Sequence, residues 1–467
     1  MLIKELHRIM VWGVLASLIV NMLSWPLNVM EGDAAYYAAA SLEMIKQHEY
    51  FHFIDFDQTH PGLAPLSFWF SHFMMSLLGP GNIALHLPGL LLTLLMLVSV
   101  YRFALLYYSR ETASLSVLVT ATLQSTFILN RTGDPVTGLA AFYMFTVWQA
   151  ALYYRNRKLQ NLVLSIIGAI LAMLSRGTYT GIGPGTFYQF TVTFWAFAPW
   201  IIWLILAIYD FLAHIRSGQG AQGSFIGVVL AVPFLLFLFN PAPSRYDLFA
   251  LYPLAAILTA AYIVKTIYIK QPAWYPRIYY GQVFLLYAWL SVLFAAVWFP
   301  FPDGNYFGLI HFMAMLSALT YLVFFSNLKH KLLISCTIAV VGTNLVLNTY
   351  FYPNLLTFQA GARLGAIAKA NGITEGQLYT LGDLPHYALH FYSGVRVKEL
   401  HTVQELQKLR SVMVYMDQQM LQSVRSVRPD VRILGTNADF HGSDIDFRFL
   451  NPDTRAQAAS TKMLIGL

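Results

Sequence analysis

Long apolar runs constrain this chain more than any other feature of its sequence. Eleven stretches are apolar over ~20 residues, the length that an α-helix needs to cross the hydrocarbon layer of a membrane. Only 11% of the 467 residues are charged, against about a quarter in soluble domains. The sequence therefore predicts an all-α polytopic membrane protein with spans near 9–27, 87–108, 112–130, 136–154, 159–175, 195–213, 225–240, 249–267, 279–299, 306–325 and 332–350.

The distribution of Lys and Arg predicts the orientation of these spans. A further apolar run at 61–79 contains Ser67, Ser71 and His72. If this run does not cross, thirteen Lys and Arg lie in the loops of one side and only four in those of the other, omitting the C-terminal part. Because Lys and Arg concentrate in cytoplasmic loops, we expect 61–79 to be a re-entrant or interfacial helix on the outer side. The net charge of +7 then reflects topology, and no nucleic acid partner is expected.

The composition changes abruptly near residue 353. We expect residues 1–352 to form the transmembrane domain, with a first outer loop over about 28–86. In residues 353–467, short β-type runs (QLYTL, SVMVYM and VRILG) alternate with a helical pattern, TVQELQKLR. An odd number of spans from a cytoplasmic N-terminus places this part outside, as a small α/β domain.

The first outer loop carries a carboxylate directly after the first span, in NVMEGDAAYYAAASLEM. From Ala34 onward the pattern predicts an amphipathic helix in the membrane interface, with Tyr36 and Tyr37 at headgroup depth. Asp33 would lie at its N-terminal edge. Asp is a favoured N-cap, so capping and catalysis are both open for Asp33 from the sequence alone.

Three other outer segments carry candidate site residues. Asp134, in NRTGDPVTG, precedes a helix start and is either a cap or turn residue or the partner of Asp33 in a metal or acid/base pair. Arg176 lies in LSRGTYTGIGPG, and Arg245 and Tyr246 lie in NPAPSRYDL. A guanidinium group suits phosphate, although a membrane anchor is the alternative for either Arg.

The sequence also leaves an alternative function open, a polytopic transporter or lipid flippase. Such proteins place ionisable residues near the membrane midplane and contain broken helices. Here the charged residues cluster at the outer interface, which favours interfacial chemistry. The glycine-rich stretches lack the patterns of nucleotide-binding loops.

The order of several segments resembles one family. EGDAAYYAAASLEM, HPGLAPLSFWF, GNIALHLPGLLLTLLMLVSVYRFALLYYS, NRTGDPVTGLAAF and SRYDLFALYPLAA follow one another as in bacterial members of the glycosyltransferase C superfamily, in the branch of protein O-mannosyltransferases and the lipid A aminoarabinose transferase. The resemblance covers about residues 1–270. It implies a protein of the bacterial inner membrane that transfers a hexosyl or pentosyl group, with inversion, from a polyprenyl-phosphate donor to a lipid, glycan or protein acceptor on the periplasmic face.

The resemblance also implies roles for individual residues. Asp33 matches the catalytic Asp of the first loop, and Asp134 matches a second-loop Asp near the same site. Arg176 stands where relatives often have Lys, and Arg245 with Tyr246 matches a region near the donor phosphate. The chain departs from the family where Ala34 replaces the Glu that usually follows the catalytic Asp.

The resemblance also implies a divalent metal ion, and Asp33 and Asp134 are the candidates to bind it. A second departure from the family lies in the first outer loop. Relatives carry an acidic residue before a Lys-Pro-Pro-Leu motif, whereas DQTHPGLAPL has no Lys and its prolines are separated. Asp57 or His60 is then the candidate in this loop for a contact with the donor or the acceptor.

Overall fold

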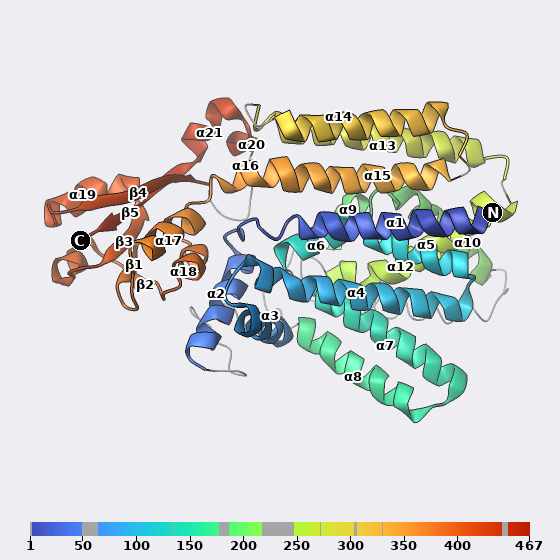
Figure 1. The fold of residues 1–467 in the computed structure, drawn as a ribbon, viewed down its shortest axis with the longest axis horizontal. Coiled ribbons are helices and arrows are strands. Elements are labelled where there is room, and N and C mark those ends of the chain that lie inside the picture. The colour runs from blue at the N-terminus through green and yellow to red at the C-terminus, as the bar shows by residue number, and fades with distance from the viewer. Residues whose placement is uncertain are drawn as a thin grey trace.

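The computed structural model describes residues 2–48, 64–133, 135–176, 186–216, 247–270, 272–302, 306–328, 330–440 and 447–467. Its helices form an elongated bundle, and the residues after 356 form a smaller unit, built on a β-sheet, beyond one end of the bundle (Figure 1). The N-terminus lies at the opposite end (Figure 1). The bundle therefore separates the start of the first helix from the C-terminal sheet.

Seven helical segments among the described residues are long and apolar enough to cross a membrane. The 26 residues of α4, for example, extend over about 39 Å at ~1.5 Å per residue, more than the ~30 Å of a hydrocarbon layer. The seven are α4 (Asn82–Tyr107), α7 (Val136–Asn156), α8 (Leu159–Arg176), α13 (Tyr275–Trp298), Leu248–Ile269 within η1 (Asp247–Leu251), α12 (Tyr252–Ile263) and η2 (Val264–Lys270), Tyr306–Phe325 over α14 (Tyr306–Thr320) and η3 (Tyr321–Phe325), and Lys331–Leu356 over α15 (Lys331–Val346), η4 (Leu347–Phe351) and α16 (Tyr352–Leu356).

Two shorter apolar helices and one bent pair add to these seven. The short helices belong to α1 (Leu2–Met22) and α10 (Ile201–Arg216), and the bent pair is α5 (Arg110–Ala121) with α6 (Gln124–Thr132). Each expected span except 225–240 overlaps one of these elements. Residues 225–240 lie outside the described part of the chain, so the number eleven stays a prediction.

Two expected spans are broken rather than continuous. The run 112–130 bends by 50° between α5 and α6, where the Thr122 hydroxyl donates to the Leu118 carbonyl (2.7 Å) in a stretch rich in Ser and Thr, whose side chains compete with helix hydrogen bonds. The run 195–213 contains the end of α9 (Thr186–Ala196) and the start of α10. Pro199 lies between them, and proline cannot donate the backbone hydrogen bond that would continue a helix.

Neighbouring side chains satisfy polar groups at these two breaks. Trp200 donates to the Thr122 hydroxyl (3.0 Å), and Gln282 donates to the Pro199 carbonyl (2.8 Å). The Gln124 and Asn344 amides exchange two hydrogen bonds, of 3.1 and 2.8 Å. Irregular backbone at membrane depth requires such internal partners because lipid offers none.

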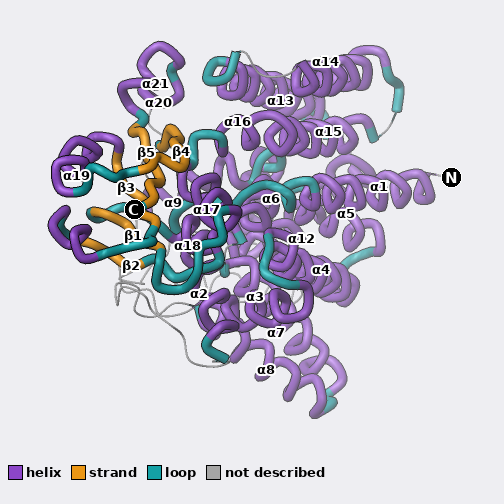
Figure 2. Tube along the Cα trace, turned by 60° about the vertical axis from the view of Figure 1, so that its left-hand side comes forward, coloured by secondary structure: helices purple, strands orange, loops and turns teal. Residues whose placement is uncertain are grey.

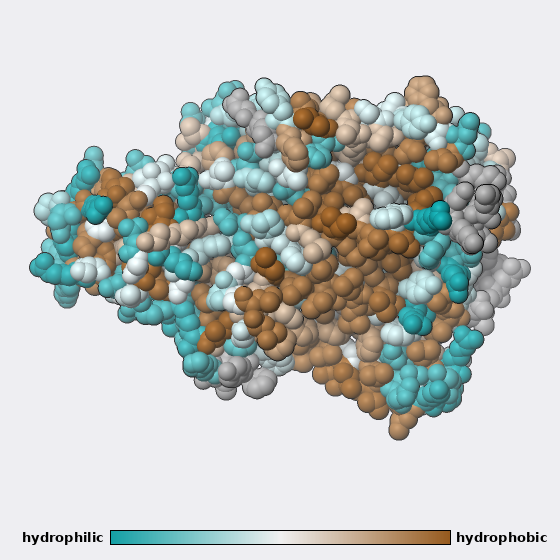
Figure 3. Space-filling view, in the orientation of Figure 1, coloured by the Kyte–Doolittle hydropathy of each residue, from teal (hydrophilic) through white to brown (hydrophobic). Residues whose placement is uncertain are grey.

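Apolar side chains also cover much of the outside of the bundle. Figure 3 shows a broad hydrophobic face over α1 and α4, with hydrophilic residues gathered toward the ends. Trp12 on α1 is 70% exposed and Phe284 on α13 is 76% exposed. Exposed apolar patches of this extent mark a surface that lipid or another protein covers, as expected for a polytopic membrane protein.

The first outer loop contributes two helices, α2 (Asp33–Lys46) and α3 (Pro65–Leu78). At ~1.5 Å per residue, the 14 residues of α3 extend over about 21 Å, too short for a ~30 Å hydrocarbon layer. Leu66 of α3 packs with Phe142 of α7 and Ala172 of α8. This short helix agrees with the prediction that the run 61–79 does not cross.

The C-terminal unit is a five-stranded mixed sheet with helices on both faces (Figure 2). Its strand order is β2-β1-β3-β5-β4, with β1 parallel to β2 and β3, and β5 antiparallel to β3 and β4. Side chains of these strands alternate between two hydrophobic cores. Tyr415 and Leu464 face helix α17 (Ala360–Ala370) on one side of the sheet. Val414 and Ile465 face η5 (Val403–Lys408) and α19 (Leu421–Val427) on the other. The strands are β1 (Leu378–Leu381), β2 (Lys398–Leu400), β3 (Met413–Asp417), β4 (Arg432–Asp439) and β5 (Ser460–Gly466), and the helices are α17 (Ala360–Ala370), α18 (Tyr387–Ser393), η5 (Val403–Lys408), η6 (Gln418–Met420), α19 (Leu421–Val427), α20 (Phe447–Leu450) and α21 (Pro452–Ala458).

The α/β character expected of this part of the chain is present, with one difference. The runs QLYTL, SVMVYM and VRILG contain residues of β1, β3 and β4. The predicted helix TVQELQKLR is instead the short 3₁₀-helix η5. A capping box of Thr402 and Glu405 starts it, but Leu406 is its one buried residue, so little packing favours a longer α-helix.

The opposite positions of the N-terminus and the C-terminal unit lead to a topological prediction. Because Lys and Arg gather at the N-terminal end of the bundle, we expect a Cys introduced after Tyr350 in the intact protein to react with an impermeant thiol reagent from the periplasm. A Cys in the 156–158 turn is the control and should be protected until the membrane is opened. Labelling of the C-terminal unit only after opening would refute the orientation.

Candidate functional site

Asp33 is the first residue of α2, and its side chain is exposed. The N-cap of α2 is Gly32, and no side chain makes the capping hydrogen bond. Gly32 has φ +116°, a conformation that residues with a Cβ rarely adopt. The capping role left open for Asp33 is therefore wrong, and its carboxylate is accessible at the positive end of a helix.

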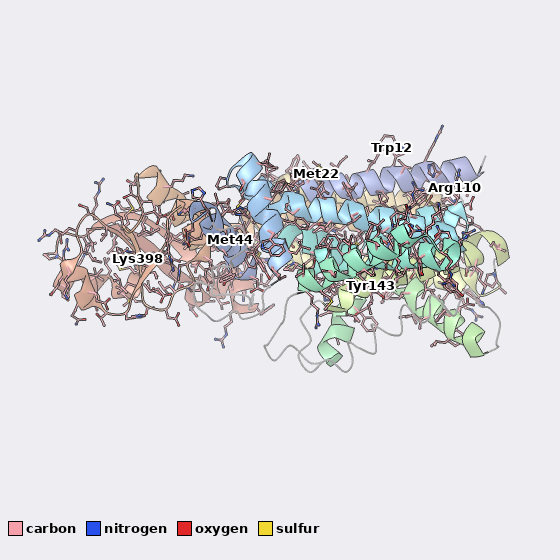
Figure 4. The ribbon with its side chains drawn as sticks, turned by 90° about the horizontal axis from the view of Figure 1, so that it is seen from below. Trp12, Met22, Met44, Arg110, Tyr143 and Lys398 are labelled. Atoms are coloured by element: carbon pink, nitrogen blue, oxygen red, sulfur yellow. The ribbon has the colours of Figure 1, made fainter. Side chains whose placement is uncertain are left out.

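The helix that carries Asp33 is packed against protein on several sides, and its predicted place in the membrane interface stays a prediction. It packs between the bundle and the C-terminal unit, where Figure 4 labels Met44. Tyr36 is 1% exposed, and its ring meets that of Tyr387 edge to face at 4.9 Å, while Tyr37 packs on Phe68. The alanines of AAYYAAA are small enough to let both neighbours approach closely, so α2 is covered on more than one side.

Glu31, two residues before Asp33, docks this loop on the C-terminal unit. Its carboxylate accepts hydrogen bonds from the backbone N–H groups of Tyr387 (2.9 Å) and Ala388 (3.0 Å) at the start of α18. Burial raises the pKa of Glu31 from 4.5 to about 7, against the lowering effect of these two N–H groups. The junction therefore holds a carboxyl group that titrates near neutrality.

From the raised pKa of Glu31 we expect the folded protein, with the first outer loop docked on the C-terminal unit, to be more stable in mild acid. Because its folded-state pKa lies above the unfolded value, its stabilising contribution is complete below pH ~4.5 and is lost as the pH rises through about 7. The shift corresponds to a free energy on the order of 3 kcal/mol. Thermal unfolding of the purified protein between pH 5 and 8 should show this decline, and Glu31→Gln should flatten it. The exposed Glu399→Gln is the control, and an equal pH slope in the Glu31 variant would contradict the assignment.

A second contact joins the other end of α2 to the same unit. Glu43 Oε1 lies 2.9 Å from His390 Nε2, and both side chains are almost fully buried. Lys46 also contacts Glu43 (3.1 Å) and reaches Glu375. Although burial raises the pKa of Glu43, the hydrogen bond from His390 and the charge of Lys46 hold that pKa below its ordinary value. Glu43 is therefore ionised at neutral pH and holds α2 in place.

Arg131 fixes the segment that leads into Asp33 from the bundle side. It is 6% exposed at the end of α6, donates to the Asn28 carbonyl (3.3 Å), and lies 4.9 Å from the centre of the Tyr352 ring. One residue further, the Val29 N–H donates to the Tyr392 hydroxyl (2.8 Å). Residues 28–31 are thus held by both the bundle and the C-terminal unit, which gives Asp33 a defined position.

Arg176 is the other predicted site residue that the structure describes. It is exposed and is the last residue of α8. That end of α8 lies at the end of the bundle that also carries α2 and α3 (Figure 1), and Ala172, one turn earlier, packs near α3. Asp33 and Arg176 therefore lie at the same end of the bundle, as the sequence predicted.

The other predicted site residues, Asp57, His60, Asp134, Arg245 and Tyr246, lie outside the described residues. The segments that directly follow two of these motifs lie side by side. Thr137 of α7 and Phe249 of η1 line one cavity of about 20 Å³, room for a single water molecule. Its other lining residues include five hydroxyl side chains, those of Thr93, Thr120, Ser125, Thr126 and Tyr252.

The predicted metal site stays a prediction. Within the described ranges, no three His, Cys, Asp or Glu side chains are grouped so that they could bind a metal ion. Asp33 is one carboxylate of the predicted pair, and Asp134 is outside these ranges. We therefore derive no step of the reaction through a metal.

Comparisons with known proteins agree with this architecture. The family model for dolichyl-phosphate-mannose-protein mannosyltransferases matches residues 59–209. The crystal structure of apo ArnT from Cupriavidus metallidurans superimposes with a TM-score of 0.68 at 12% identity, over 98% of this chain and 97% of that one. The chain has a glycosyltransferase C fold.

This glycosyltransferase C fold includes the C-terminal unit, because the match extends over nearly the whole chain. The structure of ArnT from the same organism bound to undecaprenyl phosphate gives a TM-score of 0.67 at 13% identity, over 98% and 97% of the two chains. A search of curated protein sequences found no match to this chain. The fold that the resemblance in the sequence implied is present.

Proposed function

We propose that this chain is an integral membrane glycosyltransferase that moves a sugar from a polyprenyl-phosphate donor to a lipid, glycan or protein acceptor. The observation that carries the proposal is the likeness, over the whole chain, to a fold whose solved member holds undecaprenyl phosphate. The match of residues 59–209 to a family of transferases that use a lipid-phosphate sugar supports it. The transferred group would be a hexose or a pentose.

The proposed reaction needs a base, and Asp33 is accessible for that role. Its carboxylate would take the proton of an acceptor hydroxyl or amine as the acceptor atom attacks the anomeric carbon. A bond forms between the acceptor atom and that carbon, and the bond from the carbon to the phosphate oxygen breaks. The electron pair leaves with the polyprenyl phosphate, and attack from the opposite side inverts the anomeric centre.

Cations would stabilise the leaving phosphate as its negative charge develops. Arg176 lies at the same end of the bundle as Asp33, and Arg245 with Tyr246 directly precedes η1, whose Phe249 lies beside the start of α7. We assign Arg176, Arg245 and Tyr246 to the donor phosphate and Asp134 to the reaction centre. Asp57 or His60 would contact the donor or the acceptor from the first loop.

The charge distribution supports a reaction on the periplasmic face of a bacterial inner membrane. Five Lys and Arg of the candidate spans lie toward the N-terminal end of the bundle: Arg102, Arg155, Lys265, Arg277 and Lys331. That end would face the cytoplasm. The end that carries Asp33 would then face the periplasm.

Two observations weigh against the transporter alternative. In the seven candidate spans, Asp, Glu, Lys and Arg occur only within about two turns of an end, whereas transporters place ionisable groups near the midplane. Transporters also use broken helices to coordinate substrates and ions. Here several polar groups near the two breaks bond with each other instead.

Transfer of label tests the proposal directly. The purified protein would be incubated in lipid nanodiscs with polyprenyl-phosphate sugars labelled in the sugar, and with bacterial membrane fractions as acceptors. We expect label to appear in a lipid, glycan or protein fraction, and free polyprenyl phosphate to accumulate in equal amount. Movement of intact donor across a liposome membrane, without transfer to any acceptor, would instead support a flippase.

A further inference from the structure

A groove lies at the end of the bundle farthest from the C-terminal unit, between α1, α4 and α5. Two cavities of about 290 and 470 Å³ form it and share His7, Met10 and Ser114. Figure 4 shows Arg110, at the edge of the groove, at the opposite end of the molecule from Lys398 of β2. The groove is therefore separate from the end of the bundle that carries Asp33.

The larger cavity has apolar walls that open toward the outside of the bundle. Val11 and Leu15 of α1 face it from one side, and Leu94 and Val98 of α4 from the other. These four side chains are between 38% and 52% exposed. An open channel of this kind, within a part of the bundle that lipid would surround, suits a hydrocarbon chain.

The mouth of the groove is cationic. Arg102 of α4 lines the larger cavity, and Arg8 of α1 and Arg110 of α5 line the smaller one. Arg110 lies near Glu111, whose pKa is lowered by its own backbone N–H, by the Ser109 hydroxyl and by the charge of Arg110. Glu111 is the one carboxylate among the lining residues, so the mouth keeps a net positive charge.

The length of the groove matches one leaflet of a membrane. From His7 at the mouth to Leu18 at the inner end, α1 rises about 16 Å at ~1.5 Å per residue, which is half of a ~30 Å hydrocarbon layer. Cations at the mouth of the groove and about 16 Å of apolar wall beside them fit a lipid with a charged phosphate and a long chain. A soluble phosphate ester would leave the walls unused.

We propose that this groove binds an anionic phospholipid of the leaflet at the N-terminal end of the bundle. Its phosphate lies between Arg102 and Arg110, and one acyl chain runs between α1 and α4 along Val11, Leu15, Leu94 and Val98. The site is independent of the proposed transfer reaction, because it uses none of the residues assigned to the donor or the acceptor. The bound lipid fills the space between α1 and its neighbours.

Native mass spectrometry of the purified full chain would measure this binding. The protein would be titrated with phosphatidylglycerol, with phosphatidylcholine of the same acyl chains, and with glycerol 1-phosphate. We expect phosphatidylglycerol to bind about tenfold more tightly than phosphatidylcholine, because the choline ammonium of the second lipid cancels the charge of its phosphate and is repelled by the guanidinium groups. Glycerol 1-phosphate should not displace it. Equal binding of the two lipids, or displacement by glycerol 1-phosphate, would overturn the proposal.

Two variants and one control locate the site. Arg102→Gln with Arg110→Gln should abolish the preference for phosphatidylglycerol, whereas Arg155→Gln with Arg157→Gln, in the α7–α8 turn at the same end, should preserve it. Val98→Trp fills the apolar channel without changing the charge of the protein. It should weaken the binding of both lipids about equally. Because Val98 is 52% exposed, this variant is expected to fold. An unchanged preference in the double Arg102 and Arg110 variant would overturn the assignment.

Discussion

Asp33→Asn is expected to give a folded, donor-binding protein that transfers sugar about 10²–10⁴-fold more slowly than the wild type, the usual cost of losing a general base. The reason is chemical, because an amide cannot accept the acceptor's proton. The structure makes the substitution informative, since the cap of α2 is Gly32 and the Asp33 side chain makes no capping bond. Transfer rates at saturating donor, together with donor affinity, would separate chemistry from binding.

A matched control for this variant is available in the C-terminal unit. Asp453 is an exposed Asp in the first turn of α21, so Asp453→Asn removes the same charge from the first turn of another helix. We expect it to transfer sugar at the wild-type rate. A wild-type rate in Asp33→Asn as well would remove Asp33 from the reaction.

Arg245→Ala is expected to slow transfer by roughly ten- to a hundredfold, the loss of one charge-assisted hydrogen bond of about 1.5–3 kcal/mol to the leaving phosphate. Arg245→Lys should recover only part of the rate, because an ammonium group cannot make the two parallel bonds of a guanidinium. Expression and thermal stability should stay unchanged. The rate of each variant would be measured with the same labelled donor.

The control for Arg245 separates phosphate binding from membrane anchoring. Arg277 is an exposed arginine near the start of α13, at the end of the bundle far from Asp33. Arg277→Ala should leave transfer unchanged. If Arg245→Ala is as active as Arg277→Ala, Arg245 is an anchor and has no part in the reaction.

The helical bundle could be predicted from the sequence because a hydrocarbon layer requires long apolar helices. Hydropathy alone missed the bend at Thr122, since a hydroxyl that bonds back to its own helix changes hydropathy little. Pro199 could have indicated the second break, because proline ends helices whatever their hydropathy. The long apolar runs thus predicted where the chain is helical, but not where a helix is interrupted.

The sequence alone could not predict which elements surround α2. Its alanines and tyrosines fit a membrane interface as well as a protein interior, and its partner α18 lies more than 300 residues away. In the sequence, Glu43 looks like any residue on the polar face of a helix, and nothing nearby indicates that it contacts His390. The carboxylate of Asp33 was recognised because it follows a span directly, a feature that local sequence does show.

The position of α2 between the bundle and the C-terminal unit has a consequence for biosynthesis. When residues 28–46 emerge on the far side of the membrane, their partners Tyr387, His390 and Tyr392 have not yet been translated. The C-terminal sheet is itself incomplete until β5 enters between β3 and β4. A nascent chain with every span inserted would therefore still lack the contacts that hold residues 28–46. On the proposed function and orientation, transfer would begin only after β5 has been exported, so a chain interrupted shortly before residue 460 would be membrane-inserted but without transferase activity.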